Sequence, residues 1–264
     1  MRFRGPDGVH AGTVEGSVVR GDGGGTVELL DPDTLALAPP YELLCPVEPP
    51  EVWCAGVTYE RSRDARIEES AAKDVYALVY DAERPELFLK DAGMRRTVGP
   101  WARIGVRADS SWNVPEPEIG LVLGDGGEIA GYTIGNDVSS RSIEGANPLY
   151  LPQAKVYAGA CALGPAVLVP DDWEAALAVR LRILDRGEVA FAGETSTARM
   201  KRSFRDLVDW LLRDNPVPPG SVLLTGTGLV PPDDFTLEPG MRVEIHVPGI
   251  GTLVNEVALA PDLL

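Results

Sequence analysis

Residues 112–141 read WNVPEPEIGLVLGDGGEIAGYTIGNDVSSR, and they carry the strongest structural signal in the chain. Two prolines, Pro115 and Pro117, drive the residue before each of them toward extended backbone. Glu116 and Glu118 are therefore expected on a β-strand, where residues two apart point to the same face of the sheet. The sequence predicts that these two carboxylates lie side by side.

Two apolar runs flank a glycine-rich turn in this stretch, which is typical of a β-hairpin. If Gly126 and Gly127 form a two-residue loop, the register of the two strands is fixed. That register brings Glu116 opposite Asp137. A loop of Asp125 and Gly126 would shift the pairing by two residues and still leave Asp137 near the same end of the hairpin.

Three carboxylates in one place repel one another unless a cation lies among them, so this hairpin indicates a hard divalent metal. Ligation by oxygen alone, with no nearby His or Cys, favours Mg²⁺ over Zn²⁺, with Mn²⁺ or Ca²⁺ as alternatives. An acidic pair on a strand is also typical of a solvated face. On the residues alone, that alternative stays open.

The bulk composition indicates a globular protein with no nucleic-acid partner. The chain has 264 residues and a formal net charge of −16, whereas nucleic acids and anionic membranes require clustered Lys and Arg. The N-terminal sequence MRFRGPDGVHAGTVEG lacks the apolar run of a signal peptide, and no stretch of about 20 apolar residues predicts a membrane span. Three cysteines without ligand-like spacing favour reduced thiols. We therefore expect a cytoplasmic protein with no membrane partner.

Glycine and proline divide the chain into two expected domains. Short β-type runs, Gly12 to Val19 and Gly25 to Leu30, precede a proline-rich linker at Cys45 to Pro50. We predict a small β-rich N-terminal domain with its linker over residues 1–50, and a catalytic domain over residues 51–264.

Strands outnumber helices in the larger part, which predicts an α+β fold. Ala65 to Tyr80 has a helix-compatible composition, and residues 193–215 carry apolar side chains three or four apart, with Thr195 to Thr197 as N-caps. The predicted strands are Val179 to Ile183, Val189 to Ala192, Val222 to Thr225 and Arg242 to Val247.

Five segments resemble, in order, successive motifs of the fumarylacetoacetate hydrolase superfamily. They are VPEPEIGLVL, GYTIGNDVSSR, PLYLPQAKVYAGACALGP, VLLTGTG and LEPGMRVEIHVPGIGTLVNEV, and the likeness spans Trp53 to Ala258. The resemblance implies a mixed β-roll catalytic domain, a divalent metal that is usually Mg²⁺, and a homodimer or homotetramer.

The resemblance also implies particular site residues. It places the metal ligands at Glu116, Glu118 and Asp137, in agreement with the hairpin argument. It places residues of the substrate pocket at Tyr59, Lys90, Arg141, Lys155 and Thr227. Lys155 becomes a candidate base, because a lysine near a metal and little water can lose its proton. Glu144 stands where many relatives carry Gln.

The segment GVTYERSRDARIEES, residues 56–70, resembles the lid of the 2-keto-3-deoxy-pentonate dehydratases within this superfamily. Hydrolytic relatives commonly carry a His near the position of Ser62, and this chain has only His10 and His246. The resemblance implies dehydration of a small 2-keto acid, a 2-dehydro-3-deoxy-pentonate, to 2,5-dioxopentanoate and water. In that reaction the lid would supply an acid for the departing C4 hydroxyl. The candidate acids are Glu60, Glu68 and Glu69.

Two other functions stay open at this level. One is an acylpyruvate hydrolase or oxaloacetate decarboxylase of the same superfamily, which would share the metal and differ in the lid. The other is a non-catalytic protein that binds a small ligand, since a fold alone does not guarantee activity.

Overall fold

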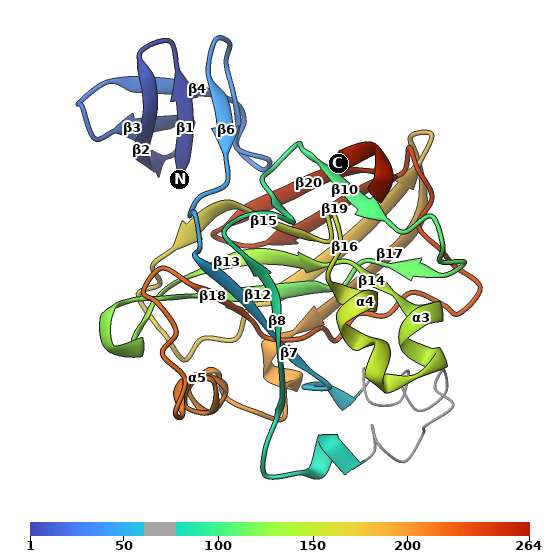
Figure 1. Ribbon diagram of the computed structural model, residues 1–264. Coiled ribbons are helices and arrows are strands. Elements are labelled where there is room, and N and C mark those ends of the chain that lie inside the picture. The colour runs from blue at the N-terminus through green and yellow to red at the C-terminus, as the bar shows by residue number, and fades with distance from the viewer. Residues whose placement is uncertain (61–77) are drawn as a thin grey trace.

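The computed structural model describes residues 1–60 and 78–264, and it is built mainly from β-strands (Figure 1). A small sheet near the N-terminus stands apart from a larger body in which two sheets are layered. The predicted α+β class with a mixed β-roll is confirmed, with strands contributing far more of the described chain than helices do.

The N-terminal sheet curls nearly into a barrel. Its strands are β1 (Arg2–Gly5), β2 (Gly8–Glu15), β3 (Val18–Gly21), β4 (Thr26–Asp31), β5 (Ala36–Leu37) and β6 (Glu42–Leu44). They pair in the order β5-β4-β3-β2-β1-β6, and the two outer strands come close to each other. The predicted run from Gly12 to Val19 is two strands, because Gly16 adopts a left-handed φ of 64° and turns the chain.

A seven-stranded mixed sheet carries most of the candidate site. It consists of β7 (Glu51–Gly56), β8 (Glu86–Ala92), β9 (Thr97–Val98), β12 (Pro117–Leu123), β13 (Ile129–Asp137), β15 (Cys161–Leu168) and β18 (Val222–Leu224). Their order is β8-β7-β18-β12-β13-β15-β9. The hairpin strand β12 is central, and all of its residues are buried.

A five-stranded sheet forms the second layer of the larger body. It contains β10 (Arg103–Val106), β16 (Ala178–Asp185), β17 (Glu188–Ser196), β19 (Arg242–Val247) and β20 (Gly251–Leu259). A short pair, β11 (Asn113–Val114) with β14 (Ser139–Ser140), stands beside the site. The strands predicted at residues 179–183, 222–225 and 242–247 are confirmed within a residue or two, and the strand predicted at 189–192 is confirmed but extends four residues farther, to Ser196.

The main hydrophobic core fills the space between the two large sheets. Ile119 and Leu121 of β12 lie in one buried cluster with Leu181 and Ile183 of β16. These four side chains have relative exposures of 1% or less. Burial of a Leu or Ile side chain stabilises a fold by roughly 1.5–3 kcal/mol, so this layer holds the hairpin rigidly in place.

The hairpin register predicted from the sequence is confirmed, although the predicted turn is wrong. Pro117 pairs with Asn136, and the N–H of Asp137 donates to the carbonyl of Glu116 at 3.0 Å. The loop has three residues, Asp125–Gly127, rather than two. A β-bulge farther along the hairpin adds one residue to β13 and restores the expected pairing.

The helix predicted within residues 193–215 exists but is short. It is α5 (Phe204–Leu212), and Ser203 caps it by accepting a hydrogen bond from the N–H of Asp206 at 3.1 Å. The predicted caps, Thr195 to Thr197, are wrong, because those residues end β17 and begin a 3₁₀ turn.

The remaining helical segments are short. They are α3 (Arg141–Ala146), α4 (Leu151–Lys155), η1 (Asp125–Gly127), η2 (Pro148–Tyr150), η3 (Thr197–Arg199) and η4 (Ala260–Leu263). The helix predicted from Ala65 to Tyr80 lies outside the described residues up to position 77, and residues 78–80 are helical. Among the described helices, none has both the length and the apolar character needed to span a membrane.

Candidate active site

Three carboxylates meet at the open end of the central hairpin. Glu116 directly precedes β12, Glu118 lies on it, and Asp137 is the last residue of β13. Each offers one oxygen, and these oxygens all lie within 4.8 Å of one another. The three residues are 4%, 2% and 1% exposed, so the alternative of a solvated acidic face is wrong.

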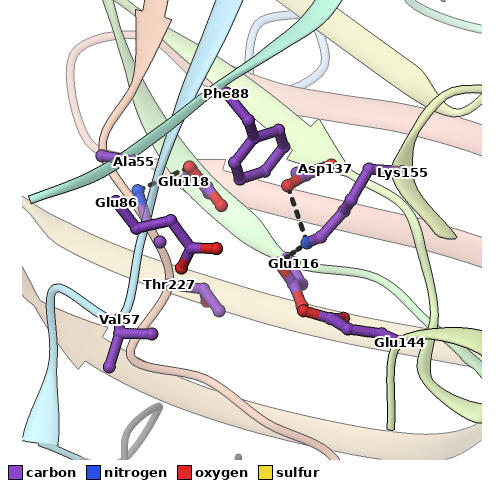
Figure 2. A pocket seen from close by; sticks show the side chains of 12 residues that line it. Ala55, Val57, Glu86, Phe88, Glu116, Glu118, Asp137, Glu144, Lys155 and Thr227 are labelled. Atoms are coloured by element: carbon purple, nitrogen blue, oxygen red, sulfur yellow. Dashed lines mark hydrogen bonds and ion pairs between the residues drawn. The ribbon is translucent and has the colours of Figure 1, made fainter. Parts of the chain in front are cut away.

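The ammonium group of Lys155 lies between two of these carboxylates (Figure 2). Lys155 ends α4, and its Nζ donates to Oε2 of Glu116 at 2.6 Å and to Oδ2 of Asp137 at 2.8 Å. It also donates to Oγ of Ser139 at 2.6 Å, and the ring of Phe88 lies 5.5 Å away. A cation is therefore already held where the carboxylates would otherwise repel each other.

Two further buried cations surround the cluster. Nη2 of Arg141 donates to Oε1 of Glu116 at 3.2 Å, and Lys90 forms an ion pair with Oδ1 of Asp137. Lys90, Lys155 and Arg141 are at most 2% exposed. Three buried cations thus face three buried carboxylates, as the high cost of burying unpaired charge requires.

Glu118 differs from its two partners because its carboxylate accepts a hydrogen bond from the backbone. The N–H of Gly226 donates to Oε2 of Glu118 at 2.6 Å. Gly226 has a left-handed φ of 88°, and a Cβ there would lie 2.1 Å from Oγ1 of Thr58. Only glycine lets the backbone approach this closely. Burial raises the pKa of Glu118 well above its usual range, and the neighbouring carboxylates of Asp137 and Glu116 raise it further.

This donor set fits a hard divalent cation. Its ligands are carboxylate oxygens, which suit Mg²⁺, Mn²⁺ or Ca²⁺, and the cysteines nearest the site are free and buried in the core. The ammonium of Lys155 occupies a place between two of the carboxylates that such an ion would share. A metal ion held by Glu116, Glu118 and Asp137 is therefore consistent with the residues present.

A small cavity of about 20 Å³ opens beside the carboxylates, with room for roughly one water molecule or one ion. Its described lining includes the three carboxylates, Lys155 and Thr227, all of which the sequence predicted as site residues. The lining also includes Glu86, Phe88 and Glu144. Figure 2 shows Glu86 pointing into the cavity and Glu144 pointing toward Glu116.

Several predicted site residues are not among the described residues that line this cavity. Arg141 and Lys90 act on the cluster from outside, through Glu116 and Asp137. Tyr59 is buried, and its ring lies so close to Gly228 that a Cβ on this glycine would come within 2.6 Å of it. Glu60 is exposed. Glu68 and Glu69 lie outside the described residues.

Sequence reasoning missed Glu86 and Phe88, although a signal was available. Residues 86–90 read ELFLK, and the period-two alternation of a strand places Glu86 and Phe88 on the face that carries Lys90. Ser139 offered no comparable signal. Its contact with Lys155 joins two residues 16 positions apart in the sequence, and no local pattern predicts that pairing.

The chain belongs to the fumarylacetoacetate hydrolase family. Residues 51–258 match the model of the fumarylacetoacetate (FAA) hydrolase C-terminal domain, which covers the two large sheets and the cavity.

Two curated relatives are similar over most of the chain. One, from Haloferax volcanii, is named a probable 2-keto-3-deoxyxylonate dehydratase and is 55% identical over 80% of this chain and 73% of its own. The other, from Saccharolobus solfataricus, is named 2-dehydro-3-deoxy-D-arabinonate dehydratase. It is 46% identical over 80% of this chain and 73% of its own.

A solved structure shares the whole architecture. It is described as 2-keto-3-deoxy-D-arabinonate dehydratase complexed with magnesium and 2,5-dioxopentanoate. It matches with a TM-score of 0.81 and 34% identity over 98% of both chains, so the likeness includes the small N-terminal sheet.

Proposed function

We propose that this protein is a magnesium-dependent hydro-lyase that converts a 2-keto-3-deoxy-pentonate into 2,5-dioxopentanoate and water. The observation that carries the proposal is the buried cluster of three carboxylates beside Lys155, in a chain 46–55% identical to two relatives named as dehydratases of such acids. The solved relative that contains magnesium and 2,5-dioxopentanoate supports the same metal and product.

Glu116, Glu118 and Asp137 would hold the metal. Bound there, Mg²⁺ would bind the keto acid, polarise its C2 carbonyl and make the C3 protons more acidic. The protein's part is to keep the site dry and ordered. The nearly complete burial of the carboxylates and of Lys155 serves that purpose, because charges act more strongly in a site that excludes water.

Lys155 is the proposed base. Its Nζ lies within 2.8 Å of oxygens of Glu116 and Asp137. It would therefore face a substrate bound to a metal that these carboxylates hold. With a metal among these carboxylates, they would no longer stabilise the ammonium form of Lys155, which would help the amine to accept a C3 proton. The bond from C3 to hydrogen and the bond from C4 to oxygen both break, and a C3–C4 double bond forms. A proton then leaves C5 and one returns to C3, which gives a C4–C5 enol. The enol hydroxyl loses its proton and C4 gains one, which gives the C5 aldehyde.

The departing C4 hydroxyl needs a proton to leave as water, and we propose Glu86, a carboxyl of the cavity lining, as its donor. Glu86 is half-buried and lines the cavity, whereas Glu60 is exposed. Glu68 and Glu69 remain candidates on the sequence argument. The proposed contacts of the substrate are Arg141, Thr227 and Tyr59. Lys90, which the resemblance also places in the pocket, contacts the metal ligand Asp137.

The function is tested by incubating the purified protein with Mg²⁺ and a panel of 2-keto-3-deoxy sugar acids, and by following aldehyde formation. We expect semialdehyde from a pentonate and no product after chelation of the metal. Oxaloacetate and an acylpyruvate are the comparison substrates. Release of carbon dioxide or acetate from them, with no aldehyde from any sugar acid, would refute the dehydratase.

The acid is tested with Glu86→Gln against Glu60→Gln as a matched control. General acid catalysis contributes about 10²–10⁴-fold, so Glu86→Gln should lower kcat by that order while metal affinity stays near wild type. Glu60→Gln should retain most of the activity. The opposite ranking would transfer the role to the segment that contains Glu60.

Three further properties are part of the proposal. We propose that residues 1–50 and 51–264 are separate domains, supported by the hydrophobic cluster of the N-terminal sheet, whose buried residues all come from residues 1–50 except Ala166. We propose a homodimer or homotetramer, to be measured by light scattering after size exclusion.

We propose a cytoplasmic location, supported by three free, buried cysteines. Burial raises the pKa of Cys45 to about 11 and that of Cys161 to about 12, which keeps both thiols protonated.

A further inference from the structure

Lys90 is a second completely buried lysine beside the carboxylates. It lies on β8, with 0% of its surface exposed. Its Nζ forms an ion pair with Asp137 and donates to the carbonyl of Val138 at 3.0 Å. The ring of Tyr157 lies 5.9 Å from the ammonium, and its hydroxyl donates to the same carbonyl at 3.1 Å.

A β-bulge at Lys90 interrupts the pairing of β7 with β8. In the pairing of β7 with β8, Val52 lies opposite Asp91 and Trp53 lies opposite Leu89, so Lys90 has no partner on β7. Bulges commonly re-aim a side chain next to a functional site. Here the bulged residue is the one whose charge meets a carboxylate of the cluster.

Asp137 is held by two lysines through different oxygens. Lys155 contacts Oδ2 and also bridges to Glu116, whereas Lys90 contacts Oδ1 and, of the three carboxylates, pairs with Asp137. A cation shared by the three carboxylates would compete with Lys155 for its partners. Lys90 would keep both Oδ1 and the carbonyl of Val138.

Lys90 is fully buried and is not among the described residues that line the cavity. Buried thiols flank it: burial raises the pKa of Cys54 and Cys161, and the charge of Lys90 partly offsets that effect. The thiols therefore stay uncharged, and the direct ionic partner of Lys90 is the carboxylate of Asp137.

We propose that Lys90 is a positioning residue: it is the permanent counter-ion of Asp137, fixes the orientation of that carboxylate toward the metal, and does not contact the substrate. Lys155, by contrast, gives up at least one carboxylate when the metal enters. This inference rests on the metal site of the proposed function. It gives the two lysines distinct tasks, one outside the metal site and one inside the cavity.

The first test uses the unmodified protein, so it does not depend on a variant that folds. Crystal structures with and without Mn²⁺ are compared. We expect Nζ of Lys90 to remain within hydrogen-bond distance of Asp137 and of the carbonyl of Val138 in both. We expect Lys155 to lose its contact with Glu116 or Asp137 in the Mn²⁺ form. A Lys90 ammonium that leaves Asp137 when the metal or a 2-keto acid binds would overturn the assignment.

The second test measures Mn²⁺ affinity by calorimetry in Lys90→Met and Lys90→Gln. Loss of an outer partner of a metal ligand typically costs about 10–100-fold in affinity, so we expect that loss for Lys90→Met. Gln retains N–H donors and should recover part of it. Lys201→Met, which removes the same charge from a partly exposed lysine, should bind Mn²⁺ as wild type does.

Steady-state kinetics at saturating metal complete the test. We expect Lys90→Met to lower kcat with an unchanged KM for the 2-keto acid, because the substrate does not touch this side chain. Wild-type Mn²⁺ affinity in Lys90→Met, or a raised KM with unchanged kcat, would overturn the proposal. Failure of the wild-type protein to bind Mn²⁺ would instead refute the metal site itself.

Discussion

Each carboxylate of the cluster is kept in place by a different kind of partner. Glu116 is held by Lys155 and Arg141, whereas Glu118 receives the backbone N–H of Gly226. A hydrogen bond from a neutral amide offsets less of the cost of burying a charge than an ammonium group does. Glu118 is therefore the member of the cluster whose charge most depends on a metal.

This arrangement predicts that metal binding releases a proton. The pKa of Glu118 is raised by burial and by its acidic neighbours, so without metal the group is protonated at pH values where a carboxyl is normally ionised. Metal needs the carboxylate form. Affinity should therefore rise with pH, by up to about tenfold per unit, until the raised pKa is passed.

Calorimetry at several pH values, in buffers of different ionisation enthalpy, measures both the affinity and the proton released. Glu118→Gln cannot titrate, so its weaker metal binding should lose most of this pH slope. An equally steep slope in Glu118→Gln would assign the proton to another group.

The elements of the site differ in how far the sequence could reveal them. The hairpin was predictable, because strand alternation and a glycine turn determine which face Glu116 and Glu118 share. Its loop was not, because a three-residue turn followed by a bulge gives the same register as a two-residue turn. The positions of Lys155 and Arg141 came from family resemblance, since their contacts with Glu116 span 39 and 25 residues.

Two glycines that follow β18 allow a prediction about steric crowding beside the site. Gly226 and Gly240 have similar φ angles, 88° and 91°, but only Gly226 has atoms within 4 Å of an added Cβ. Gly240→Ala should lower the free energy of unfolding by about 1–2 kcal/mol through backbone strain alone. Gly226→Ala should lower it further and weaken metal binding, because a contact of 2.1 Å with Thr58 would push the chain away from Glu118.

Urea unfolding and metal titration of both variants check this difference. If the two substitutions cost the same stability and leave metal affinity equal, the close approach of Gly226 has no role in the site.

The cap of α5 allows a separate test of local stability. Ser203 accepts the N–H of Asp206, so Ser203→Ala should lower the free energy of unfolding by about 1 kcal/mol. Ser203→Asp preserves a capping oxygen and should stay near wild type. Urea unfolding of the two variants measures the effect, and an unchanged midpoint for Ser203→Ala would show that the end of the helix is held by tertiary packing instead.

At the scale of the whole molecule, the net charge of −16 creates a second way to bind divalent cations. Diffuse attraction to an acidic surface is weakened by salt, whereas a buried site is screened much less. Any measured effect of metal on stability must therefore be separated into these two parts.

Thermal unfolding in about 0.15 M KCl makes the separation, because surface attraction falls off within about 8 Å there. A metal at one hundred times its Kd adds about 2.7 kcal/mol to the free energy of unfolding. For a chain of this length that is a rise in Tm of roughly 5–10 °C. Glu118→Gln changes the net charge by one unit while removing a ligand, so its Tm should barely respond to the same Mg²⁺. A shift of equal size in both proteins would mean that the acidic surface, and not the three buried carboxylates, binds the ion.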